Sequence, residues 1–128
     1  MNYRLKKISG DASFREFYRL KKGNRTSIIV KANKEKYKNL IAYAIINKIL
    51  KQNIIIAPKL LNNHYQHNMI EISDLGQKTF FDMILKKKKK LNYYKNLIKI
   101  IFKLQKIKIK KKYFFGKYKF KFQKYSLK

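Results

Sequence analysis

Cysteine is absent from the 128-residue sequence, so the chain can form no disulfide, no thiolate nucleophile and no cysteine-ligated metal site. Long apolar segments are absent as well, since the longest strictly apolar run, Ile54 to Ala57, is far too short to span a bilayer. The basic N-terminus is followed by no apolar signal segment. These absences predict a cytoplasmic protein that has no membrane partner.

Proline and glycine are also scarce, with one and four residues respectively, and no Pro-, Gly- or Ser-rich linker divides the chain. A length of 128 residues with 45% hydrophobic content is sufficient for one small globular domain. We therefore expect no second full lobe.

Acidic residues are few: 6 Asp and Glu accompany 34 Lys and Arg, which gives a formal net charge of +28. Such a charge is typical of proteins that bind nucleic acid or anionic surfaces. However, 30 of the basic residues are Lys, and the abundant Lys, Ile, Asn, Tyr and Phe all have AT-rich codons, so base composition alone would produce this bias. Few Arg residues also means few bidentate donors for bases and phosphates. Nucleic acid is therefore not the expected partner, and a small basic nucleic-acid-binding or ribosome-associated protein is the alternative function.

Alternating apolar residues and intervening turn residues predict three antiparallel strands at the start of the chain. The strands are expected over residues 3–8, 14–20 and 26–32. Turn-forming clusters at residues 9–13 and 21–25 separate them. Within the second strand, alternation predicts an apolar face that Glu16 interrupts and an opposite face that carries Arg15 and Arg19. The apolar face consists of Phe14, Tyr18 and Leu20.

The apolar period changes to three and four residues between about residues 35 and 52, which predicts an amphipathic helix. Its apolar positions are Tyr37, Leu40, Ile41, Ala44, Ile45 and Ile49. Beyond Pro58, the segments 59–61 and 68–73 are expected to be strands, with a turn signal at residues 62–64. The predicted order is three strands, one helix and two strands.

Two further helices are expected in the second half of the chain. A short helix over residues 79–85 has Thr79 as its candidate N-cap and Asp82 in its first turn. Five consecutive lysines, residues 86–90, are interpreted as a solvated helix end or loop. A second helix follows, with an apolar stripe that we expect to face a core, formed by Leu91, Tyr94, Leu97, Ile98, Ile101 and Leu104. The pattern assigns no secondary structure to residues 107–128.

A glycine-bearing turn between two antiparallel strands, followed by a lysine on the third, is an arrangement that kinases use to cover and neutralise phosphates. The turn Gly10 to Ser13 and Lys31 have this order. Backbone N–H groups of a tight turn, the Ser13 hydroxyl and the Lys31 ammonium are suitable donors to phosphate oxygens. A structural turn and a solvated lysine would have the same pattern.

The string Gly10-Asp11-Ala12-Ser13-Phe14-Arg15-Glu16-Phe17-Tyr18-Arg19-Leu20 resembles the opening motif of the aminoglycoside phosphotransferase and choline kinase superfamily. It is most similar to the branch that phosphorylates N-acetylmuramate and N-acetylglucosamine at the anomeric position. Later landmarks follow in family order: Ser27 to Val30, Ala57-Pro58, and Met69 to Gly76 leading into an interlobe hinge. The resemblance covers about residues 3–106.

This resemblance implies an α+β fold in two parts. Residues 1–76 would form a protein-kinase-like, nucleotide-binding N-terminal lobe, a five-stranded antiparallel sheet plus one helix. Residues 77–128 would form the linker helices and the start of a truncated C-terminal lobe. The apolar side of the second helix around Ile98, Ile101 and Leu104 packs within the larger lobe in the family, so the resemblance implies that it is partly uncovered in this chain. The implied cofactors are ATP and Mg, and the implied acceptor in the complete family is a small-molecule sugar.

The resemblance also implies which residues contact the nucleotide. The phosphates would lie under Gly10, Asp11, Ala12, Ser13 and Phe14. The backbone of Glu71, Ile72 and Ser73 would lie beside the adenine edge. Lys31 falls near the position of the phosphate-contacting lysine, and Glu35 is the candidate for its ion-pair partner.

Catalytic groups of the superfamily are missing from this chain. The base and the magnesium ligands would lie in a His-x-Asp…Asn loop and a following acidic motif, and neither is present. His64 and His67 are interpreted as turn or surface residues, and the only carboxylate side chain after Gly76 belongs to Asp82. We therefore expect no catalytic or metal-binding residue, and a truncated or partial ATP-dependent phosphotransferase that is inactive by itself.

Overall fold

The computed structural model describes residues 3–8, 15–32, 38–86, 89–110 and 112–122 and shows an α+β fold. A five-stranded antiparallel sheet has the strand order β1-β2-β3-β5-β4. Its strands are β1 (Tyr3–Ile8), β2 (Arg15–Lys22), β3 (Arg25–Ala32), β4 (Leu60–His64) and β5 (Met69–Ser73). The expected sheet is confirmed, and so is the placement of one helix between the third and fourth strands.

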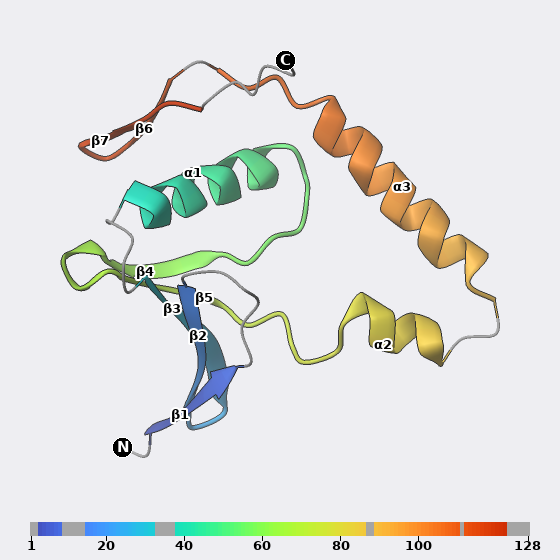
Figure 1. The fold of residues 1–128 in the computed structure, drawn as a ribbon, viewed down its shortest axis with the longest axis horizontal. Coiled ribbons are helices and arrows are strands. Elements are labelled where there is room, and N and C mark those ends of the chain that lie inside the picture. The colour runs from blue at the N-terminus through green and yellow to red at the C-terminus, as the bar shows by residue number, and fades with distance from the viewer. Residues whose placement is uncertain (1–2, 9–14, 33–37, 87–88, 111, 123–128) are drawn as a thin grey trace.

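Helix α1 (Lys38–Gln52) packs across one face of this sheet (Figure 1). Its apolar positions Leu40, Ile45 and Ile49 are buried against alternate residues of β3 and β5. The sheet residues in this core are Ile28, Val30, Ala32, Ile70 and Ile72. Because side chains alternate across a strand, the residues between them project from the opposite face, which we call the open face.

Strand β2 corrects one expectation from the sequence. Its core-facing side chain is Phe17, which packs against the buried cluster, so Arg15 and Arg19 share the face that α1 covers. Tyr18 lies on the open face, where its hydroxyl donates to the Glu16 carboxylate at 3.0 Å. The predicted apolar face of this strand is wrong because Glu16 and Tyr18 form a polar contact there. Phe14 lies outside the described residues.

Between α1 and β5 the chain forms β4 and a single 3₁₀ turn, η1 (Tyr65–His67). Asn68 then adopts a left-handed conformation with φ of 52°, which Asn tolerates better than most residues. Strand β5 lies between β3 and β4 and is paired on both edges. Strand β5 agrees with the predicted segment 68–73 except at Asn68, whereas the turn predicted at residues 62–64 is wrong, because β4 continues through His64 and the chain reverses at η1.

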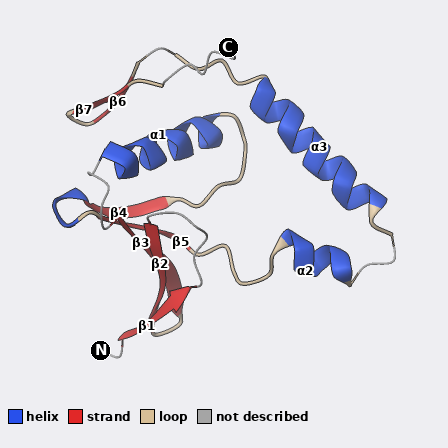
Figure 2. Ribbon diagram, viewed as in Figure 1, coloured by secondary structure: helices blue, strands red, loops and turns tan. Residues whose placement is uncertain are grey.

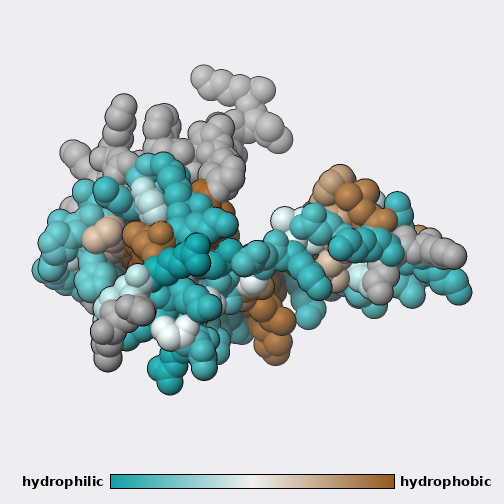
Figure 3. All heavy atoms as spheres, turned by 90° about the horizontal axis from the view of Figure 1, so that it is seen from below, coloured by the Kyte–Doolittle hydropathy of each residue, from teal (hydrophilic) through white to brown (hydrophobic). Residues whose placement is uncertain are grey.

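The second half of the chain begins with two helices, α2 (Phe80–Leu85) and α3 (Leu91–Gln105), which project away from the sheet as an arm (Figures 1 and 2). The N-cap prediction for Thr79 is confirmed, because its hydroxyl accepts from the Asp82 N–H at 3.1 Å and its own N–H donates to the Asp82 carboxylate at 2.9 Å. The predicted core-facing stripe of α3 is not covered, and no residue of α3 is buried. Figure 3 shows apolar side chains on the surface of this arm.

The tail that the sequence pattern does not assign forms a hairpin of β6 (Tyr113–Phe115) and β7 (Tyr118–Phe120). Gly116 begins its turn with φ of 55°, which two-residue hairpin turns favour. The hairpin packs against the buried cluster, and the rings of Tyr65 and Tyr118 meet edge to face with centroids 5.5 Å apart. The hairpin residues thus extend the core that α1 and the sheet form. The division into two parts at residue 76 stays a prediction.

Within the described residues no helix is long and apolar enough to cross a membrane.

Candidate functional site

The residues predicted to contact a nucleotide fall into three groups in the structure. Gly10, Asp11, Ala12, Ser13, Phe14 and Glu35 lie outside the described residues. Lys31, Glu71 and Ser73 lie on adjacent strands, and alternation places all three side chains on the open face. Ile72 is buried and belongs to the core beneath α1. The structure therefore brings Lys31, Glu71 and Ser73 onto one surface.

Glu71 is held by two side-chain donors on neighbouring strands. Its carboxylate accepts from the Ser27 hydroxyl at 2.5 Å and from the Asn62 amide at 2.7 Å. The hydrogen bond from Ser27, followed by that from Asn62, lowers the pKa of Glu71. These bonds link β3, β4 and β5 across the open face and hold the carboxylate in its ionised form.

The backbone of residues 71–73 takes part in sheet pairing on both sides. Ser73 pairs with Ser27 of β3, while its N–H donates to the Lys59 carbonyl at 2.8 Å. The Ser73 hydroxyl also accepts from the Lys59 N–H at 2.8 Å. Because these backbone groups are already paired, an adenine base beside β5 would contact backbone groups of the residues that follow Ser73.

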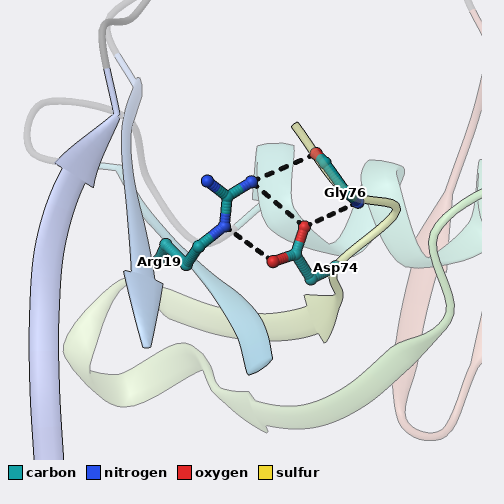
Figure 4. Close-up of polar contacts among 3 residues, drawn as sticks. All are labelled: Arg19, Asp74 and Gly76. Carbon is teal, nitrogen blue, oxygen red and sulfur yellow. Dashed lines mark hydrogen bonds and ion pairs between the residues drawn. The ribbon is translucent and has the colours of Figure 1, made fainter. Parts of the chain in front are cut away.

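Those following residues form a clamp with β2, which we define as Arg19, Asp74 and Gly76 (Figure 4). The Arg19 Nε donates to Asp74 Oδ2 at 2.6 Å, and Nη2 donates to Asp74 Oδ1 at 3.2 Å and to the Gly76 carbonyl at 3.1 Å. The Gly76 N–H donates to Asp74 Oδ1 at 2.9 Å. Gly76 has φ of 98°, a conformation that favours glycine. The clamp fixes the path of the chain as it leaves the sheet.

The hydrogen bonds of the clamp shift the pKa of both charged partners, against the effect of burial. The Asp74 side chain is 6% exposed and that of Arg19 is 21% exposed. The hydrogen bond from Arg19 lowers the pKa of Asp74, and the same bond raises the pKa of Arg19. A bidentate guanidinium and carboxylate pair of this kind is both directional and strong.

Sequence reasoning did not identify this clamp. The sequence pattern predicts only that Arg19 lies opposite the apolar face of the second strand, and the resemblance includes Asp74 in the segment Met69 to Gly76 that leads into the hinge. The available signal was that Arg19 alternates with Phe17, so whichever face buries the aromatic ring also requires a partner for the guanidinium.

A second set of charges lies on the open face near Lys31. The Lys7 ammonium donates to the Glu16 carboxylate at 2.8 Å, and this bond raises the pKa of Lys7. Glu16 stands directly opposite Lys31 in the pairing of β2 with β3. The acidic residue that the described structure places beside Lys31 is therefore Glu16.

The remaining carboxylate, Asp82, has a structural role at the start of α2. Its side chain accepts from the Thr79 N–H and hydroxyl, and the backbone bond is the main cause of its lowered pKa. The described residues contain no cluster of three or more His, Asp or Glu side chains suited to a metal ion. The carboxylates of the described residues, Glu16, Glu71, Asp74 and Asp82, each accept hydrogen bonds from neighbouring groups.

A cavity of about 610 Å³ lies between α1, the loop after it and the hairpin residue Phe115. Its walls are mainly apolar, with Lys48, Lys51 and Lys59 among its lining residues. None of the residues predicted to contact a nucleotide lines it. The cavity is therefore a separate feature of the fold.

No family model, curated protein or solved structure matches this chain, so the reading of the site depends on the residues and contacts described above.

Proposed function

We propose that this chain contains the nucleotide-binding lobe of an ATP-dependent phosphotransferase that acts on a small-molecule alcohol such as an amino sugar. The fold supports this in its element order, since three antiparallel strands, one helix and two strands is the order that the sequence resemblance implies. The strand order β1-β2-β3-β5-β4 also puts β1 and β2, which flank the glycine-bearing segment in sequence, in one sheet with β5.

The observation that carries the proposal is the clamp. Two of the strings that carry the resemblance are residues 10–20 and 69–76, and Arg19 of the first binds Asp74 and Gly76 of the second. The pair is separated by 55 residues in sequence. Two motifs that a nucleotide site requires together are thus joined by a largely buried ion pair.

Sheet register supports two separate ends for the proposed site. Lys31 lies opposite Glu16, next to the start of β2, so it is close to the point where the described chain resumes at Arg15. Ser73 lies opposite Ser27, at the other end of β3. The four-residue separation of Ser27 and Lys31 corresponds to about 13 Å along a strand. An extended ATP would span this distance, with its base near residues 74–76 and its phosphates near Lys31.

Phosphoryl transfer requires more than these contacts. A base beside the acceptor hydroxyl and ligands for magnesium supply most of the catalysis in such enzymes. Asp82, the only carboxylate side chain after Gly76, caps α2. The chain by itself therefore binds the nucleotide without transferring its phosphate. Turnover of MgATP requires residues that supply the base and the magnesium ligands.

The test measures binding and turnover separately. A fluorescent ATP analogue should bind the purified chain, and Lys31→Ala should weaken this binding roughly tenfold, as expected for loss of one charge-assisted contact. Lys22→Ala is the matched control. Lys22 is exposed, as Lys31 is, but it lies on β2 at the other end of the sheet. With MgATP and N-acetylmuramate or N-acetylglucosamine, the chain should form no sugar phosphate above a reaction without protein.

Two results would contradict the proposal. Absence of saturable nucleotide binding would contradict the proposed ATP-binding function. Equal effects of Lys31→Ala and Lys22→Ala would contradict the proposed position of the phosphates beside Lys31. Magnesium-dependent turnover by this chain alone would show that residues 74–128 contain catalytic groups that the described structure does not reveal.

A further inference from the structure

Helix α3 presents a continuous apolar surface to solvent. Its large apolar side chains are between 43% and 65% exposed, with Tyr93 and Leu97 half-buried. The exposed members are Leu91, Tyr94, Ile98, Ile100, Ile101, Phe102 and Leu104. At 100° per residue these positions cover more than half of the helix circumference. An apolar face of this width normally packs against another surface.

The polar side of α3 is narrow and carries only positive charge. Lys95, Lys99 and Lys103 recur every four residues and therefore form one stripe, with Asn92 and Asn96 beside them. The surrounding sequence has the same sign, since residues 83–128 contain 18 Lys and neither Asp nor Glu. The helix thus combines a wide apolar face with a narrow polar side whose only charges are positive.

The described part of the chain does not cover this face. The β6–β7 hairpin, which follows α3, packs on α1 and the sheet instead. Helix α2 contacts α3 through Phe80 and Tyr94, whose rings meet edge to face with centroids 6.2 Å apart, and this contact leaves Tyr94 49% exposed. Figure 3 shows apolar side chains at the surface of the projecting arm.

Charge decides which partner fits. A second copy of the chain would bring two all-lysine arms together, and their repulsion opposes association. Single-stranded nucleic acid would satisfy the lysines. However, bases stack on aromatic side chains, so the aliphatic Ile98, Ile101 and Leu104 would remain without a partner. An anionic bilayer offers acyl chains for the aliphatic face and phosphates for the lysines.

We propose that α3 docks in the plane of an anionic phospholipid bilayer, with its apolar face inserted and Lys95, Lys99 and Lys103 at the level of the phosphates. Fifteen residues span about 22 Å, too short to cross the hydrocarbon core but suited to lying on it. Long lysine stems allow the ammonium groups to reach the headgroups from the flank of the inserted face. This docking does not depend on the nucleotide-binding proposal. It differs from the sequence expectation of no membrane partner, which rested on the lack of a crossing segment.

The first experiment follows binding of the full chain to vesicles. The chain should float with vesicles of equal parts phosphatidylcholine and phosphatidylglycerol, and much less with phosphatidylcholine alone. The sequence contains no tryptophan, so Phe102→Trp introduces a single reporter on the apolar face. Its emission should shift to shorter wavelength on addition of the anionic vesicles. Tyr3→Trp, at a 57% exposed position on β1, is the control and should not shift.

Matched substitutions test each side of the helix. Ile101→Asn should reduce anionic vesicle binding at least about tenfold through loss of inserted apolar surface, whereas Ile56→Asn, at a 92% exposed loop position, should not change it. Lys99→Glu should weaken binding more than Lys51→Glu, which reverses an exposed lysine on α1. Unchanged far-ultraviolet circular dichroism of each variant confirms that the sheet and helices persist.

Several results would overturn the proposal. These are equal binding to neutral and anionic vesicles, no binding to either, or equal effects of Ile101→Asn and Ile56→Asn. A single-stranded oligonucleotide that binds the chain, displaces it from vesicles and loses affinity with Lys99→Glu but not Ile101→Asn would instead assign the arm to nucleic acid. Concentration-dependent self-association abolished by Ile101→Asn, without lipid binding, would assign the face to a second copy.

Discussion

Removing the carboxylate of the clamp by Asp74→Ala tests whether it joins β2 to the segment after β5. The substitution deletes two acceptor oxygens whose donors include Arg19 Nε, Arg19 Nη2 and the Gly76 N–H. Because Asp74 is only 6% exposed, the loss leaves the Arg19 guanidinium in a largely desolvated position. Breaking a buried pair in this way costs about 3 kcal/mol, at the lower end of the usual range because Arg19 still reaches some solvent.

Thermal unfolding followed by circular dichroism measures this loss. For a chain of this length, about 3 kcal/mol corresponds to a fall in Tm of roughly 10 °C. Lys7→Ala is the control, since it breaks an ion pair of similar distance whose lysine is 62% exposed, and little change in Tm is expected. Combining Asp74→Ala with Arg19→Ala should cost less than the sum of the single losses, because both remove the same bonds.

The loss of stability caused by Asp74→Ala should depend on pH in a defined direction. The pKa of Asp74 is lowered in the folded state, so its contribution to stability is present above the unfolded carboxyl pKa and is lost as pH falls through the folded value. The stability difference between the unsubstituted chain and Asp74→Ala should therefore be constant near neutral pH and shrink below about pH 4. If Asp74→Ala unfolds at the same temperature as Lys7→Ala, the clamp does not stabilise the fold and the reasoning is refuted.

Three further substitutions test the packing of the other elements. Leu40→Ala empties a fully buried position between α1 and the sheet and should cost about 2–5 kcal/mol by denaturant unfolding, whereas Ile54→Ala, 85% exposed, should cost far less; equal losses would contradict the observed core. Phe120→Ala removes a ring of β7 that packs on the core, so the hairpin should become sensitive to limited proteolysis before the sheet does, and unchanged cleavage would contradict this docking. Thr79→Ala removes the hydroxyl that accepts from the Asp82 N–H and donates to its carboxylate, so amide exchange at the start of α2 should accelerate while that of α1 does not, and unaltered exchange would show that this hydroxyl is dispensable.

The order of the elements could be predicted from the sequence because each depends on neighbouring residues. Alternation and turn clusters identify the strands, and three- and four-residue spacing identifies α1 and α3. Thr79 and Asp82 lie three residues apart, so the cap of α2 is a local property of the chain. Such features require no knowledge of what lies on the other side of the sheet.

The tertiary structure alone decided which surfaces meet. Arg19 contacts Asp74 because β5 pairs with β3, which in turn pairs with the strand of Arg19. This pairing of β3 with β5 brings together strands that α1 and β4 separate in sequence. The side of β2 that carries Phe17 is buried because α1 covers that side, although Tyr18 and Leu20 on the other side are also hydrophobic. The β6–β7 hairpin packs on α1 while α3, with an apolar stripe just as clear in the sequence, does not. Hydrophobic burial is non-directional, so a local pattern specifies that a face can be covered, and only the arrangement of the whole chain specifies which element covers it.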